Sequence, residues 1–394
     1  MAPLHVCAID TIRACILVGL LFVTMDIGLI NPAEDQHMSR NLAPDTILCQ
    51  THIAAMLSVK AANSFVALDG DGQFRLATLD ANGELQLNDI NFSPPFPIDG
   101  CGSDPAAGLI WAIRGRGLYV FDLDNRITRH RDFTIVGDEE IRQVLVCDRV
   151  RKLLLVSVFQ LWDGMTRLSL YDLTADSLVS DTLAYVDSFI RIEDGRILCN
   201  GRDDPSAAFA VRLLNITEGK IRIDATSWLA SRLTQRKALL NALLLPKEME
   251  NAGLFCQIET GVGQYALCSV RWSSREREVS LEPWTVQYAN EFQIAPFFSV
   301  DQSGSWMRAP VFDAVDIRSD HSALFHLDNR YPQGVSAPVL AEGSRGESPG
   351  AFVQHEEWGG LYLEPDIQRD YVILVFRLQN AQRIAERITP SVKQ

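Results

Sequence analysis

The sequence lacks the paired ligands that usually hold zinc. It contains eight cysteines and seven histidines, but no Cys-x-x-Cys and no His-x-x-x-His pair. Cys49 and His52 have a zinc-like spacing, yet no second pair follows at the usual distance. We therefore predict no metal site and no cofactor. Several of the cysteines lie in apolar runs, where a free thiol behaves as a small buried hydrophobe; these are Cys147, Cys199, Cys256 and Cys268.

Positive charge is also scarce. The chain has 36 Lys and Arg against 50 Asp and Glu, which gives a net charge of −14 and a pI near 5.0. A protein that binds a phosphate backbone needs a concentrated basic face. The densest basic runs, 126–131 and 232–237, are short, and we interpret them as a solvated turn and a helix face. The charge pattern predicts no nucleic-acid partner.

Helical patterns are few, and strand patterns dominate. One helix is expected within the repeats, where Thr226 can cap residues 227–233 and places Trp228 and Leu229 near one side. Most other apolar runs are short and are separated by Gly, Asp and Asn, which suit tight hairpins. The pattern predicts an all-β protein.

The N-terminus carries the longest apolar run. Residues 14–23 are uninterrupted by polar side chains and follow Arg13, as in the hydrophobic region of a signal peptide. Extended to Ile30, the segment is barely long enough to span a bilayer. The residues that follow form a poor cleavage site, so a cleaved signal and an uncleaved anchor both stay open. We predict that residues 1–35 are a helical signal peptide or anchor. The protein would then lie in the cell envelope, either periplasmic or extracellular, or anchored by residues 14–30, with no other membrane contact.

A short strand signature recurs along the chain. Val-Phe-Asp-Leu-Asp-Asn occupies 120–125, Leu-Phe-His-Leu-Asp-Asn occupies 324–329, and Val-Phe-Arg-Leu-Gln-Asn occupies 375–380. Degraded copies lie around Thr78, Asp172, Asn215 and Arg271. The central residues of the seven copies are 44, 50, 43, 56, 55 and 51 residues apart, the period of propeller blades.

Seven such units cannot hide both faces of their sheets alone, whereas a radial arrangement buries each sheet between two neighbours. We therefore predict a seven-bladed β-propeller of four-stranded antiparallel blades over residues 50–390. The last blade would take residues 382–387 as its outer strand. The chain resembles the broad propeller group with YVTN and WD40-like repeats, without the Gly-His and Trp-Asp pairs of WD40 blades or the pattern of quinoprotein blades. The resemblance implies fold alone.

Several motifs resemble catalytic or binding sites. Residues 346–350 spell Gly-Glu-Ser-Pro-Gly, which matches the motif of a nucleophile elbow. That elbow needs a strand before the serine and a helix after it, so we predict a loop between blades here instead. Asp69-Gly70-Asp71-Gly72 lacks the further ligands of a calcium loop and predicts a hairpin. His355 is expected in an exposed turn. Asp122 and Asp172 are expected to accept backbone N–H groups of the next turn.

Three acids stand near the starts of expected inner strands: Glu139, Glu140 and Asp187. Nothing in their spacing links them as a metal or acid/base set, and a fold alone licenses no activity. We predict no catalytic residues. The leading hypothesis is an exported or tethered platform that binds protein partners. The alternative is a hydrolase or lactonase-like enzyme with carboxylates at the channel.

One hairpin permits a prediction of register. A loop centred on Val262 would pair Glu259 with Tyr265 and would place Cys256 opposite Cys268. Opposed residues in antiparallel strands are close enough for a disulfide, so both a bond and two free thiols remain open for this pair.

Overall fold

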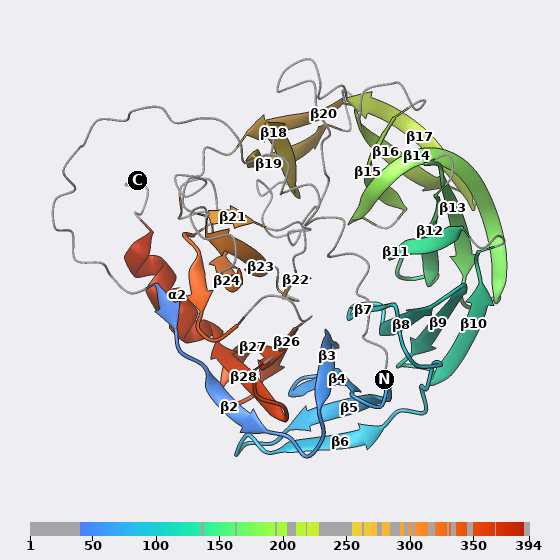
Figure 1. The fold of residues 1–394 in the computed structure, drawn as a ribbon. Coiled ribbons are helices and arrows are strands. Elements are labelled where there is room, and N and C mark those ends of the chain that lie inside the picture. The colour runs from blue at the N-terminus through green and yellow to red at the C-terminus, as the bar shows by residue number, and fades with distance from the viewer. Residues whose placement is uncertain are drawn as a thin grey trace, which may run out of the picture.

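The computed structural model shows an all-β chain in which antiparallel sheets are arranged as a ring (Figure 1). It describes residues 40–389, except for 135–137, 162–163, 194, 203–209, 218, 228–253, 262–263, 274–277, 284–291, 295–298, 302, 304, 314–319, 329–330, 332–335, 345–349 and 367. The predicted helical segment over residues 1–35 lies outside the described residues. Among the described helices, none is both long enough and apolar enough to cross a membrane.

The first two sheet units each contain four strands in chain order. Unit 1 comprises β3 (Ile53–Ser58), β4 (Ser64–Asp69), β5 (Phe74–Leu79) and β6 (Leu85–Asp89). Unit 2 comprises β7 (Gly100–Asp104), β8 (Leu109–Arg114), β9 (Gly117–Asp122) and β10 (Ile127–Asp132). Every side chain of β4 is buried, as expected for a strand covered on both faces.

Units 3 and 4 share one long strand, β14 (Ser177–Glu193). The first half of β14 pairs with β13 and its second half pairs with β15, so one strand serves both units. Unit 3 also contains β11 (Glu139–Asp148), β12 (Leu153–Gln160) and β13 (Thr166–Asp172). Unit 4 continues with β15 (Arg196–Arg202), β16 (Ala210–Thr217) and β17 (Lys220–Ser227).

Units 5 and 6 are less regular in their described parts. Unit 5 has three described strands, β18 (Leu254–Gly261), β19 (Gln264–Ser273) and β20 (Glu278–Pro283). Unit 6 comprises β21 (Phe292–Ile294), β22 (Ser299–Val300), β23 (Trp306–Asp313), β24 (Asp320–His326) and β25 (Val339–Ala341).

The two ends of the described chain close the ring together. Unit 7 is built from β26 (Ala351–His355), β27 (Gly359–Pro365) and β28 (Val372–Arg377), and its outer strand is β2 (Asp45–Leu48) from the N-terminal side. β1 (Asn41–Leu42) pairs in parallel with β25 of unit 6. The helix α2 (Leu378–Ile388) then packs against β1, β24, β25, β27 and β28. Residues 41–48, which precede the predicted propeller boundary at residue 50, thus belong to its sheets.

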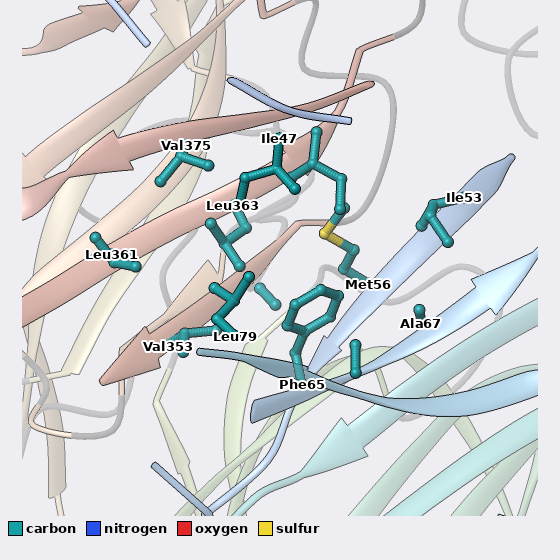
Figure 2. Close-up of a cluster of buried hydrophobic side chains, with 13 residues drawn as sticks. Ile47, Ile53, Met56, Phe65, Ala67, Leu79, Val353, Leu361, Leu363 and Val375 are labelled. Atoms are coloured by element: carbon teal, nitrogen blue, oxygen red, sulfur yellow. The ribbon is translucent and has the colours of Figure 1, made fainter. Parts of the chain in front are cut away.

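Apolar cores lie between neighbouring units. One cluster joins Met56, Phe65 and Leu79 of unit 1 to Val353 and Leu363 of unit 7 (Figure 2). Similar clusters fill the contacts of unit 1 with 2, 2 with 3, 3 with 4, and 6 with 7. At these five contacts the sheets bury their faces against each other, which is the physical reason for the ring.

Two local predictions are wrong. Thr226 does not begin a helix, because residues 226 and 227 pair with Arg212 and Val211 at the end of β17; residues 228–233 lie outside the described residues. Residues 382–387 are not a strand but part of α2. Leu378, Ala381 and Ala385 recur at helical spacing and are buried. The outer strand expected there is supplied by β2.

Candidate functional site

The acidic residues at strand ends hold turns, as predicted. The Asp122 carboxylate accepts the backbone N–H groups of Asp124 and Asn125, each at 3.1 Å. Asp172 accepts that of Ala175 at 2.8 Å. The turn at Asp69 is the predicted hairpin, since its carboxylate accepts the N–H of Gln73 at 2.8 Å. These carboxylates satisfy turn donors that would otherwise need water.

Asp122 also joins two units. The Lys152 ammonium, in the β11–β12 turn of unit 3, donates to its carboxylate at 2.5 Å. Burial by itself raises the pKa of Asp122, but the hydrogen bonds from Lys152 and Asn125 outweigh burial and hold the pKa below its ordinary value. Asp122 is therefore ionised, and its carboxylate links units 2 and 3.

The acids expected at the inner strands do not converge among the described side chains. Glu139 is buried and accepts from Gln160 at 3.1 Å, with the Arg167 guanidinium 3.5 Å away. Glu140 is exposed and pairs with Arg142 at 2.8 Å. The backbone of Asp187 lies in β14, and its side chain is outside the described set. Within the described residues, no group of three His, Cys, Asp or Glu could hold a metal ion.

Two ion pairs share the Asp104 carboxylate near the inner strands of units 2, 3 and 4. The Arg149 Nε lies 3.0 and 3.1 Å from the two Asp104 carboxylate oxygens. Arg191, which is buried, approaches the same carboxylate at 3.6 Å. Because each residue comes from a different unit, this cluster ties three consecutive units together at one end of their inner strands. The spacing of these residues in the sequence did not predict this cluster.

A second buried polar cluster lies between units 6 and 7. The Arg308 Nε donates to Ser322 at 3.0 Å, and both Ser322 and Tyr362 donate to Glu364, at 3.1 and 2.9 Å. Burial raises the pKa of the Glu364 carboxyl despite the opposing effect of Arg308, whose Nη2 lies 3.9 Å away. These four side chains thus lie in a contact from which water is excluded. Each polar group there has to find its hydrogen-bond or ion-pair partner within the protein, so the cluster is important for the stability of the contact between units 6 and 7.

The remaining motifs have structural explanations or lie outside the described residues. His355 is buried rather than exposed, and its Nδ1 accepts the N–H groups of Glu357 and Trp358 at 3.2 and 3.1 Å. The His355 imidazole therefore stabilises the turn between β26 and β27. Ser348 lies outside the described residues, but the next element after it is strand β26, not the helix of a nucleophile elbow.

The antiparallel order gives the ring two distinct faces. Connections within the first and last hairpins of a unit lie on one face, which we call the hairpin face. Connections between the two hairpins, and those between successive units, lie on the other, which we call the crossover face. Five large apolar residues that are more than half exposed lie in these crossover connections or at the strand positions next to them: Leu48, Phe96, Leu161, Leu183 and Tyr371.

Two ion pairs lie at strand ends on the same face. Arg75 contacts Asp89 at 3.1 Å, and Arg114 contacts Asp99 at 3.6 Å. Exposed pairs contribute little to stability, about 0–1 kcal/mol each. They do reduce the number of isolated charges that a docking partner would have to desolvate. The crossover face is therefore the best candidate for an interaction surface.

Comparison with known proteins shows the fold. No protein-family model matches the chain, and no curated protein sequence matches it. Among solved structures, an oligogalacturonate lyase in complex with manganese is 11% identical, with a TM-score of 0.52 over 87% of this chain and 98% of that chain. A chain of the mitotic checkpoint complex is 8% identical, with a TM-score of 0.51 over 91% and 98%.

The β-propeller domain of the trilobed protease from Pyrococcus furiosus is 11% identical, with a TM-score of 0.46 over 83% of this chain and 95% of that domain. Identities this low carry no information on activity. The two matches with TM-scores above 0.5 agree with the predicted resemblance to β-propeller structures at the level of fold alone: the chain is all-β and is built from several four-stranded antiparallel sheets.

Proposed function

We propose that this protein is a seven-bladed β-propeller that serves as a protein-binding platform through its crossover face. The observation that carries the proposal is the set of exposed apolar residues on that face, together with two ion pairs at its strand ends. The described strands support seven units when the long sheet is divided at β14. Exposed apolar side chains grouped on one face are typical of interaction sites.

The alternative, an enzyme with carboxylates at the central channel, has less support. Glu139 is engaged by Gln160 and Arg167, and Glu140 by Arg142. A general acid or base needs a carboxylate aimed at a substrate rather than neutralised by a fixed arginine. We therefore favour binding over catalysis.

We also propose that the protein acts in the cell envelope, reached or anchored through residues 14–30. The support is the apolar run of residues 14–23 behind Arg13. Fractionation of cells producing the full-length chain tests this proposal. Recovery of the full-length chain in the cytosolic fraction would contradict it.

The platform is tested by cross-linking and pull-down of the protein with its cell-envelope neighbours. We expect a stoichiometric partner with the unmodified protein and its loss in the triple variant Phe96→Asp, Leu161→Asp, Leu183→Asp. Val150→Asp is the matched control, because Val150 is 88% exposed but lies in a turn of the hairpin face. Circular dichroism should show the same fold in all three proteins.

Two outcomes would overturn the platform proposal. One is the absence of any stoichiometric partner. The other is a partner that binds the triple variant as well as the unmodified protein, because the binding surface would then lie elsewhere.

A further inference from the structure

Two cysteines of unit 5 occupy opposed positions in a hairpin. Strands β18 and β19 pair in the predicted register, with Ile258 opposite Ala266 and Cys256 opposite Cys268. The irregularity between Glu259 and Gly261 lies nearer the turn and does not shift the cysteine pair. The register prediction is therefore confirmed at the level of the backbone.

Opposed residues of an antiparallel pair have Cα atoms about 4.5–5.5 Å apart and lie on the same face of the sheet. Disulfides commonly span about 4.4–6.8 Å between Cα atoms. We infer that Cys256 and Cys268 form a cross-strand disulfide when the protein meets a disulfide oxidant, and that this bond locks the β18–β19 hairpin. The inference does not depend on the proposed platform function.

Oxidised glutathione can act as the oxidant in two thiol–disulfide exchange steps. The thiolate of one cysteine attacks the glutathione disulfide, which forms a mixed disulfide and releases one glutathione thiolate. The second cysteine thiolate then attacks the protein sulfur of the mixed disulfide and releases the other. The two cysteine sulfurs lose two electrons in total, and their two protons end on the two reduced glutathione molecules.

Other described cysteines lack this arrangement. Cys101 pairs with Ala112, and Cys199 pairs with Phe189 and Arg212. Burial raises the pKa of the Cys101 thiol to about 11 and that of Cys147 to about 12, which keeps both as unreactive thiols near neutral pH. They provide internal controls for selective oxidation.

A single tryptic peptide contains both cysteines, so mass spectrometry can detect the bond within it. No Lys or Arg lies between Lys247 and Arg271, so trypsin releases both cysteines in one peptide, residues 248–271. The full-length reduced chain is refolded in a glutathione redox buffer, blocked with N-ethylmaleimide under denaturing conditions and digested. We expect this peptide to carry no maleimide and to have lost two hydrogen atoms, while the peptides of Cys101 and Cys147 carry maleimide.

The same oxidation is measured with the protein held unfolded in concentrated urea. Native pairing should make the bond about tenfold or more harder to reduce than in the unfolded chain, because the paired strands keep the two residues opposite each other. Cys256→Ser should leave one maleimide on the peptide. Two maleimides on the refolded unmodified peptide would overturn the inference, as would a bond no more stable in the folded chain than in the unfolded one.

Discussion

Asp69, Asp122 and Asp172 stand at strand ends, and each accepts backbone N–H groups of the turn that follows. The same residue type, at the mouth of a channel, could have served as a catalytic acid. The sequence pattern favoured the turn role over the catalytic role, because Thr, Asn, Arg and His replace the aspartate of the signature in other repeats. At the scale of residues, a turn donor needs only a local acceptor, which Asp, Asn, Thr and His side chains can supply and Arg cannot.

Positive φ at turn glycines leads to a first prediction. Gly72 has φ +81°, and a Cβ there would meet the Phe96 ring at 2.3 Å. Gly115 also has positive φ, at +55°, but a Cβ there would meet nothing within 4 Å. Gly72→Ala should therefore lower the free energy of unfolding by about 1–3 kcal/mol more than Gly115→Ala does. Urea unfolding of both variants measures the difference, and equal losses would show that the Phe96 ring moves aside freely.

Glu364 gives a prediction of pH dependence. Burial raises its pKa in the folded protein, against the opposing influence of Arg308. Its contribution to stability is therefore full below the unfolded pKa of about 4.3 and is lost as pH rises through the folded value. Glu364→Gln removes this loss but leaves Arg308 without a carboxylate at every pH.

We therefore expect the free energy of unfolding of Glu364→Gln, relative to the unmodified protein, to improve as pH rises from 4 to 7.5. Urea unfolding at several pH values measures this trend, whatever the size of the constant offset from Arg308. A difference that stays constant over that range, or falls, would contradict the raised pKa.

At the scale of elements, continuous apolar runs predicted strands well. The runs at residues 64–68 and 152–159 became β4 and β12, both buried by neighbouring sheets. Residues 382–387 were wrongly predicted as a strand, because a short run of mixed polarity does not distinguish the helical period from the strand period. The helix there gains its stability from packing Leu378, Ala381 and Ala385 against the seam between units 6 and 7.

The packed face of α2 should be sensitive to charge. Ala385 is fully buried, whereas Asn380 is exposed on the same helix. Ala385→Asp should lower the free energy of unfolding by about 3 kcal/mol or more, because it buries an unpaired carboxylate. Asn380→Asp should stay within about 0.5 kcal/mol of the unmodified protein. Thermal or urea unfolding separates these outcomes, and similar effects of both changes would mean that α2 is not docked.

At the scale of the whole molecule, closure depends on both ends of the described chain. β2 supplies the outer strand of unit 7, and β1 adds to unit 6. Ile47 also enters the core shared by units 1 and 7 (Figure 2). The ring is therefore completed by pairing between residues more than 290 positions apart, since residue 48 pairs with residue 372.

Deletion of residues 1–48 should open this closure. We expect weaker cooperativity of unfolding and binding of a hydrophobic dye, because unit 7 loses a strand and its core loses Ile47. Deletion of residues 1–39 is the matched control, since it retains β1 and β2. Equal unfolding transitions for the two shortened chains would show that β1 and β2 contribute little to the ring.

The sequence by itself determined the all-β class, the repeat, most strands of units 1, 3 and 4 and the Cys256–Cys268 register, because these depend on local period and turn chemistry. Only the tertiary structure decided which strand completes unit 7, that residues 382–387 form a helix, and that Asp104 meets Arg149 and Arg191. These features join residues from distant units, and their stability comes from burial and pairing that no short stretch of sequence contains.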